Sequence, residues 1–307
     1  MQFALFQMTM TALVNVSYAL IVGALAAQLW LRSTAENRAQ PVYDSLASIM
    51  GIGFVVGAGA TLMSLWQASA AMADVPLRER GPSLWAIFAN TSYGRFGLTS
   101  FAVLAVGAAV HFKMGRRVPS GAYPGTILCI LGMFAVCRVA TRHAAESGLF
   151  SVAAVVELTH VFSMALWLRS VLIAAWVVLP KATSATGFTG IETYLALLSS
   201  WATVALAGVL STGLYNVFRV LNTSAELINT QYGWALTTKL FFVVVAIALG
   251  GWNRLVGFPA AAAAAKSDAS DERMGAITSV LRVESISLLI VLIAAAAVTA
   301  NASPSSS

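Results

Sequence analysis

Eight long apolar stretches constrain this chain more than any other feature of its sequence. They run at about 10–31, 46–67, 96–112, 122–144, 150–179, 193–218, 235–253 and 277–300. Each approaches the roughly 20 helical residues that cross a hydrocarbon core of about 30 Å. Backbone groups in lipid must be satisfied within the structure, and the alternation typical of a membrane barrel is absent. The sequence therefore predicts an all-α polytopic membrane protein, a bundle of about eight transmembrane helices.

Composition excludes several other classes of protein. Only 10% of the 307 residues are charged and 59% are hydrophobic, whereas a soluble domain carries about 25% charged residues. A soluble enzyme is therefore excluded, and we read the net charge of +6 as loop charge and not as a nucleic-acid-binding surface. The sequence has no GxxxxGK[ST] phosphate loop. We expect a protein that is not an enzyme, and any transport to be passive or ion-coupled.

The connections between the stretches are short, which predicts a single domain over residues 1–302 among membrane lipids and a disordered tail over 303–307. The aromatic end of connection 68–95 is expected to lie along the membrane interface. Small residues around Gly53 and Gly57 are expected to let two helices approach closely. Lys and Arg are slightly more frequent in the odd-numbered connections, which favours a cytoplasmic position for these and an outer position for both termini.

Polar side chains inside membrane spans are default functional candidates because they are costly there. Glu157, His160 and Met164 in the fifth stretch are spaced i, i+3, i+7 and share one helical face. Carboxylate, imidazole and thioether groups together can bind a transition metal, and a thioether favours Cu(I). The alternative is a buried histidine that is hydrogen-bonded to Glu157 or to a neighbouring helix.

The fourth stretch adds a second set of soft ligands. Cys129, Met133 and Cys137 follow at steps of four, which predicts a column along the helix, although Cys and Met also serve as ordinary core residues. His143 comes near the end of that helix, in the same half of the bilayer as His160. Two such histidines would also suit the axial ligands of a b-type haem. By contrast, His111 is expected to be interfacial, and Arg169, Arg282 and Glu284 are read as topology and packing residues.

Several short motifs follow one another in the order found in a known family. They are His143-Ala144, Glu157-Leu-Thr-His160, Ala165-Leu-Trp167-Leu, Ser211-Thr-Gly213-Leu-Tyr215, Tyr232-Gly233 with Lys239, Gly251-Trp-Asn253-Arg254 with Pro259, and Arg282-Val-Glu284. In this order they resemble the copper resistance D (CopD) family over roughly 140–300. Arg142 stands where that family has a glycine, and Arg169-Ser170 replace its glycine pair.

The resemblance implies an eight-helix protein of the bacterial inner membrane that handles copper, with copper ions as its ligand. The family is generally regarded as moving copper from the periplasm to the cytoplasm, often with a periplasmic copper-binding partner of the CopC type. The expected function is thus a copper permease with a site formed by His143, Glu157, His160 and Met164, joined by the soft column of the fourth stretch. A membrane haem protein and a non-transporting scaffold for periplasmic copper proteins are the alternatives.

Overall fold

A computed structural model describes residues 2–32, 40–73, 81–114, 121–141, 151–184, 191–220, 231–260 and 270–300. In these ranges the chain is helical and contains no strand. The elements are α1 (Gln2–Arg32), α2 (Gln40–Ala73), α3 (Gly81–Asn90), α4 (Ser92–Met114), α5 (Tyr123–Ala140), α6 (Val152–Ile173), η3 (Ala174–Val178), α7 (Leu179–Ser184), α8 (Ile191–Val220), α10 (Gln231–Trp252), η4 (Asn253–Gly257) and α12 (Ser270–Ala300).

Eight candidate membrane spans lie within these residues, each a helix long and apolar enough to cross a bilayer. The predicted all-α, polytopic architecture is therefore confirmed, and every predicted stretch falls on one of them. The predicted ends differ in places. The fourth span, α5, ends at Ala140, before the predicted end at 144. His143 and the predicted tail 303–307 lie outside the described residues.

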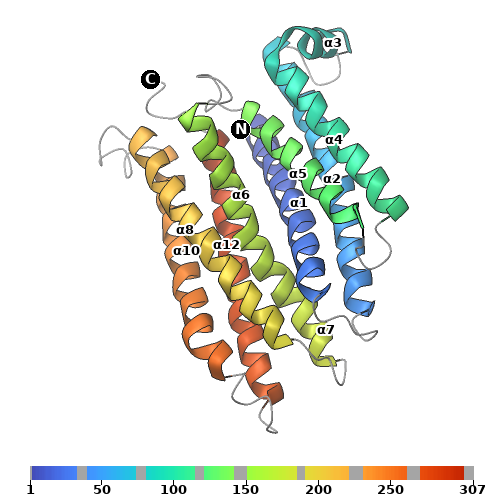
Figure 1. Cartoon of the computed structure of the whole chain (residues 1–307). Coiled ribbons are helices and arrows are strands. Elements are labelled where there is room, and N and C mark those ends of the chain that lie inside the picture. Colours follow the sequence, from blue (N-terminus) through green and yellow to red (C-terminus); the bar gives the residue numbers. More distant parts are fainter. Residues whose placement is uncertain are drawn as a thin grey trace.

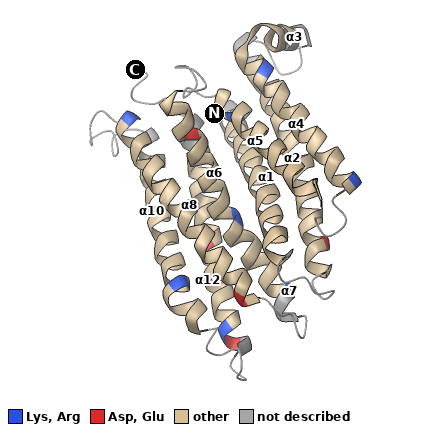
Figure 2. Cartoon of the chain, in the orientation of Figure 1, with Lys and Arg blue, Asp and Glu red and all other residues tan. Residues whose placement is uncertain are grey.

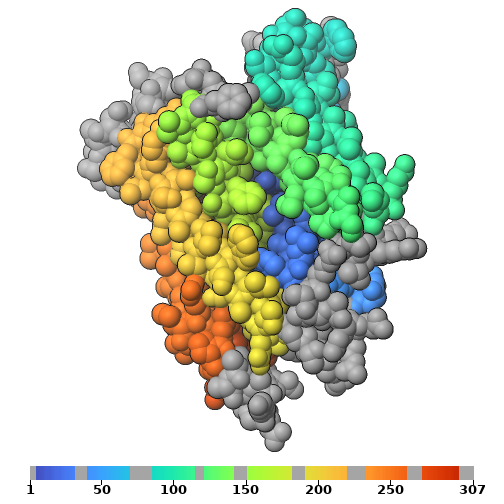
Figure 3. Space-filling view, viewed as in Figure 1, coloured from blue at the N-terminus to red at the C-terminus, as the bar shows by residue number. Residues whose placement is uncertain are grey.

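The helices run up and down in chain order, so that the start of α1 and the end of α12 lie at the same end of the bundle (Figure 1). Helix α1 packs against α2, α6 and α12, while α8 packs on α6 and α10 on α12. In the space-filling view α8 covers one side of α6 (Figure 3). The short helix α3 lies across the end of α4 (Figure 1), and its Trp85 is exposed, consistent with the interfacial position predicted for this connection.

Charged residues are sparse along the spans and gather near the helix ends, as the hydrophobic composition requires (Figure 2). The helices pack closely where small residues meet. A Cβ atom on Gly53 would lie 2.7 Å from Ile21 Cγ1, and one on Gly57 would lie 3.1 Å from Ser17 Cβ. Both glycines therefore allow α2 to approach α1, as predicted.

Two spans contain a π-helical segment in their last third. Helix α6 continues through η3 into α7, and α10 continues into η4. The N–H groups of Leu179 and Phe258 bond the carbonyls five residues earlier, Ala174 O and Asn253 O. Single-turn π segments are rare in proteins and occur often at functional sites. Both segments lie in the half of the bundle formed by α6 to α12.

Candidate functional site

The contact between α6 and α8 contains a ladder of polar and small residues. Asn216 Nδ2 donates a hydrogen bond to Glu157 Oε2 (3.4 Å), and His160 Nδ1 lies 2.9 Å from Thr212 Oγ1. One turn further along, a Cβ on Gly208 would lie 2.3 Å from Ser163 Oγ. Because the two helices are antiparallel, each step of about one turn along α6 meets a step of about one turn back along α8. Glu157 and His160 thus face one neighbour, α8, as their shared face predicted.

Hydrogen bonding at Thr212 defines the orientation of the His160 ring. The Thr212 hydroxyl donates to the carbonyl of Gly208, so its oxygen accepts the proton of His160 Nδ1. In a neutral imidazole the other ring nitrogen, Nε2, then carries the lone pair that a metal requires. Metal-binding histidines commonly donate their second ring N–H to such a partner, which fixes the tautomer and the ring orientation.

Met164 continues the stripe deeper in α6 and is partly buried against the hydrophobic core. At 1.5 Å per residue, it lies about 6 Å beyond His160 along the helix, and His160 lies about 13 Å from the helix start at Ser151. Among the described residues, no group of three His, Cys, Asp or Glu side chains could hold a metal ion. The described part of the stripe therefore offers an oxygen, a nitrogen and a thioether, and not a closed metal cage.

The predicted soft column of α5 does not form a single surface. Cys129 and Met133 are exposed on the outside of the bundle, whereas Cys137 is buried. Each step of four residues advances about 40° beyond a full helical turn, so two steps turn Cys137 about 80° away from Cys129. Among the described residues, the cysteines of this column form no group of three metal-binding His, Cys, Asp or Glu side chains with α6.

His111 lies in the last turn of α4 and is buried against neighbouring helices. It is 3% exposed, its Nδ1 lies 2.7 Å from the Tyr123 hydroxyl, and its Nε2 lies 2.8 Å from the carbonyl oxygen of Ala47. A carbonyl can only accept, so Nε2 carries the proton and the Tyr123 hydroxyl donates to Nδ1. Both ring nitrogens are occupied, and His111 joins α2, α4 and the start of α5. The hydropathy pattern gave no signal for these partners.

Two arginines within the spans stack on aromatic rings. Arg169 is fully buried, with its guanidinium carbon 4.5 Å from the centre of the Tyr18 ring on α1. The guanidinium carbon of Arg282 lies 5.0 Å from the centre of the Trp176 ring, and Trp176 Nε1 donates to Ser285 Oγ at 3.0 Å. Arg169 faces α1 and not α8, so the arginine that replaces a family glycine points away from His160. Both arginines thus pack against aromatic side chains.

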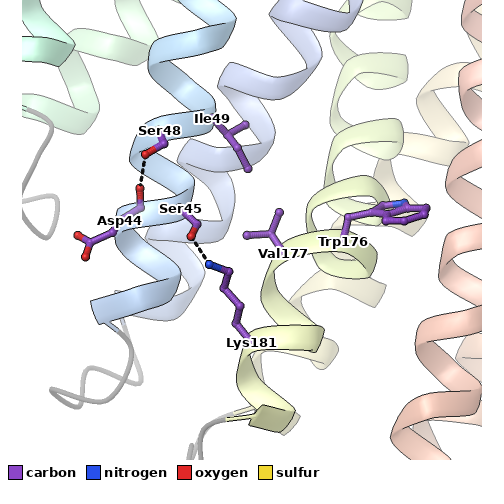
Figure 4. Close-up of a pocket in the computed structure, with 7 residues that line it drawn as sticks. All are labelled: Asp44, Ser45, Ser48, Ile49, Trp176, Val177 and Lys181. Carbon is purple, nitrogen blue, oxygen red and sulfur yellow. Dashed lines mark hydrogen bonds between the residues drawn. The ribbon is translucent and has the colours of Figure 1, made fainter.

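A shallow pocket lies between α2 and the η3–α7 end of the α6 span (Figure 4). It is lined by Asp44, Ser45, Ser48, Ile49, Trp176, Val177 and Lys181. Lys181 Nζ donates to Ser45 Oγ, which ties α7 to α2. The lining contains no His, Cys or Met, so this pocket is not the soft-metal site that the sequence predicts.

Fold and site together define a polytopic helical membrane protein with a histidine and a carboxylate on one face of an inner helix. Residues 192–298 match the family model of Copper resistance protein D (CopD), and the chain is similar to that family over this segment. No curated protein and no solved structure shows significant similarity to the chain. The match covers α8, α10 and α12 and includes Thr212 and Asn216, while α6 lies before it. The family is that of the sequence resemblance, over a shorter range.

Proposed function

We propose that this protein is a copper permease that carries copper across the membrane past Glu157, His160 and Met164. The observation that carries the proposal is the pairing of His160 with Thr212 across the α6–α8 contact. It joins the sequence-predicted ligand to the segment that matches a copper resistance family. We propose a transport protein without catalytic activity, in which copper is the cargo.

The ligand set suits an ion that is passed on. A transported ion must bind strongly enough to enter and weakly enough to leave. Glu157, His160 and Met164 follow one another along α6 at intervals of about one turn. Among the described residues, no group of three His, Cys, Asp or Glu side chains surrounds any of them. Thioether and imidazole ligands both suit copper, and the thioether favours Cu(I). The order along the helix supports stepwise movement from Glu157 towards Met164.

Direction and location rest on the orientation of the bundle. We propose the bacterial inner membrane, with both termini in the periplasm and inward movement of copper. The start of α6 then faces the periplasm, so an ion from a periplasmic CopC-like partner would meet Glu157 before His160 and Met164. A reporter that is active only in the periplasm should function at the C-terminus and fail within 113–121. The reverse result would place the start of α6 on the cytoplasmic side.

The second candidate function is haem binding at His160, because the sequence contains a second histidine that could serve as the other axial ligand. Close packing argues against it at this contact, since even a Cβ atom on Gly208 would overlap Ser163. A haem between α6 and α8 would have to separate these helices. A Soret band in the purified protein, lost in His160→Ala, would favour haem over copper transport.

The experiment that tests the proposal compares copper accumulation in cells that express wild type, His160→Ala or Glu157→Ala. We expect each substitution to reduce copper-dependent accumulation to the level of cells without the protein, while membrane insertion is retained. Met133→Ala is the matched control, since Met133 lies on the outside of the bundle. Wild-type accumulation in both α6 variants would remove the site from this face, and would favour a scaffold that recruits periplasmic copper proteins.

A further inference from the structure

A second polar cluster lies deeper in the bundle, between α6, α10 and α12. Glu284 of α12 is 2% exposed, and its Oε1 accepts a hydrogen bond from Trp167 Nε1 at 3.1 Å. The same oxygen lies against the backbone of α10, because a Cβ on Gly250 would be 2.9 Å from it. Glu284 is about 12 residues, or about 18 Å, from Glu272, where the candidate membrane span of α12 begins, which places it well inside the span.

Asn253 completes this cluster. It is 1% exposed, lies at the first position of the π segment η4, and its amide is beside the Glu284 carboxyl group. Neither Nδ2 nor Oδ1 of Asn253 makes a hydrogen bond of good geometry with a described residue. Buried polar groups of this kind are rare in proteins, and each one calls for an explanation.

No described cation forms an ion pair with Glu284. Among the described residues, the side chains positioned to bond the carboxyl group are those of Trp167 and Asn253. The charged or titratable groups on the elements packed around it are Tyr18, Glu157, His160, Arg169, Lys181, Lys239, Arg254, Glu272, Arg273 and Arg282. Arg169 stacks on Tyr18, Arg282 stacks on Trp176, and Arg254 is exposed. An isolated carboxylate is costly in a dry interior, and it avoids that cost by taking up a cation or a proton.

The Asn253 amide suits both protonation states of such a carboxyl group. A protonated Glu284 has an O–H that can donate to Asn253 Oδ1, and an ionised Glu284 can accept from Asn253 Nδ2. Trp167 Nε1 only donates, and it holds the other carboxyl oxygen in either state. Trp167 and Asn253 therefore hold the Glu284 carboxyl group in place whether it is protonated or ionised. A residue that gains and loses a proton requires such neighbours.

We propose that Glu284 is a proton-binding site inside the membrane, positioned by Trp167 and Asn253, and that the proton is the ion coupled to transport. In the step, the Glu284 O–H bond breaks, its electron pair stays on the carboxylate, and the proton passes to water. The reverse step restores the acid, and no redox change occurs. Proton binding does not depend on the proposed copper transport, whereas the coupling rests on it.

Proton binding can be measured by infrared difference spectroscopy of the purified full-length protein during a pH titration. We expect a carbonyl band of a buried protonated carboxyl group that is lost in Glu284→Gln and retained in the matched control Glu157→Gln. Asn253→Ala should shift the band and its midpoint. A band that persists in Glu284→Gln, or the absence of any such band in wild type, would overturn the proposal. A midpoint that falls steadily with sodium concentration would also overturn it, because the carboxylate would then hold sodium.

Coupling requires liposomes that contain the protein and an imposed pH gradient. We expect the gradient to accelerate copper uptake by wild type at least several-fold and to have no effect on Glu284→Gln. An undiminished response in Glu284→Gln would overturn the coupling while leaving copper transport intact. No uptake by wild type under any gradient would overturn the proposed function and the coupling together, while the infrared result would still decide whether Glu284 binds a proton.

Discussion

The two described histidines occupy opposite kinds of environment. His111 sits between α2, α4 and α5, is almost fully buried, and uses both ring nitrogens on protein partners. His160 is partly buried in the α6–α8 contact, is oriented through Nδ1 by Thr212, and has a carboxylate one turn away. The first environment fixes a ring as a link between helices. The second orients the ring through Nδ1, and in the neutral tautomer Nε2 then carries the lone pair that the proposed copper site requires. Hydrogen-bond partners, and not depth alone, therefore separate a structural from a candidate ligand histidine.

The largest expected effect on stability is at His111. Replacing it with Ala leaves the Tyr123 hydroxyl and the Ala47 carbonyl without their partner and creates a cavity, which should lower the free energy of unfolding by about 2–4 kcal/mol. Equilibrium unfolding in detergent measures this loss. The matched variant is His160→Ala, for which we expect a smaller loss of about 1 kcal/mol, because the ring is only partly buried. Equal losses at the two positions would remove the distinction between these environments.

A smaller effect is expected from the residue that orients His160. Thr212→Val keeps the shape of the side chain and removes the hydroxyl that accepts from Nδ1, so copper affinity should fall by about tenfold, as for other partners of metal ligands. Thr212→Ser retains the hydroxyl and serves as the control. Copper titration of both purified variants measures the difference. Unchanged affinity in Thr212→Val would show that this hydrogen bond does not prepare a ligand.

The smallest effect is expected in α5. A double Cys129→Ala, Cys137→Ala variant should transport copper at the wild-type rate, because one thiol lies outside the bundle and the other is turned towards its interior. The loss of stability should stay below about 1.5 kcal/mol, since the change in volume is small. Transport assays in liposomes decide the matter. A severe loss of copper uptake with normal stability would restore the soft column as part of the path.

Several of these features could be predicted from the sequence because they depend on local periodicity. Hydropathy located all eight spans, and the i, i+3, i+7 spacing placed Glu157 and His160 on the same face of α6. Their partners could not be predicted, since Thr212 is 52 residues from His160 and Asn216 is 59 from Glu157. The family motifs include Thr212 in the Thr-Gly step, but they did not pair it with His160.

Other features depend on three-dimensional packing and gave no local signal. His111 lies near a helix end, where hydropathy indicates an interface, and only the return of the chain at Tyr123 encloses it. Steps of four residues suggested a straight column in α5, but the helical rotation separates its ends. The interpretation of Glu284 as a packing residue did not include Asn253, which reaches it through the arrangement of α10 and α12.

The central claim is that copper binds at His160 and not at His111. The most direct measurement is metal analysis, together with a visible spectrum, of purified wild type, His160→Ala and His111→Gln after exposure to copper. We expect copper to remain with the wild type and with the folded fraction of His111→Gln, and to be lost from His160→Ala, with no Soret band in any sample. Copper retained in full by His160→Ala, or lost only from His111→Gln, would contradict the account.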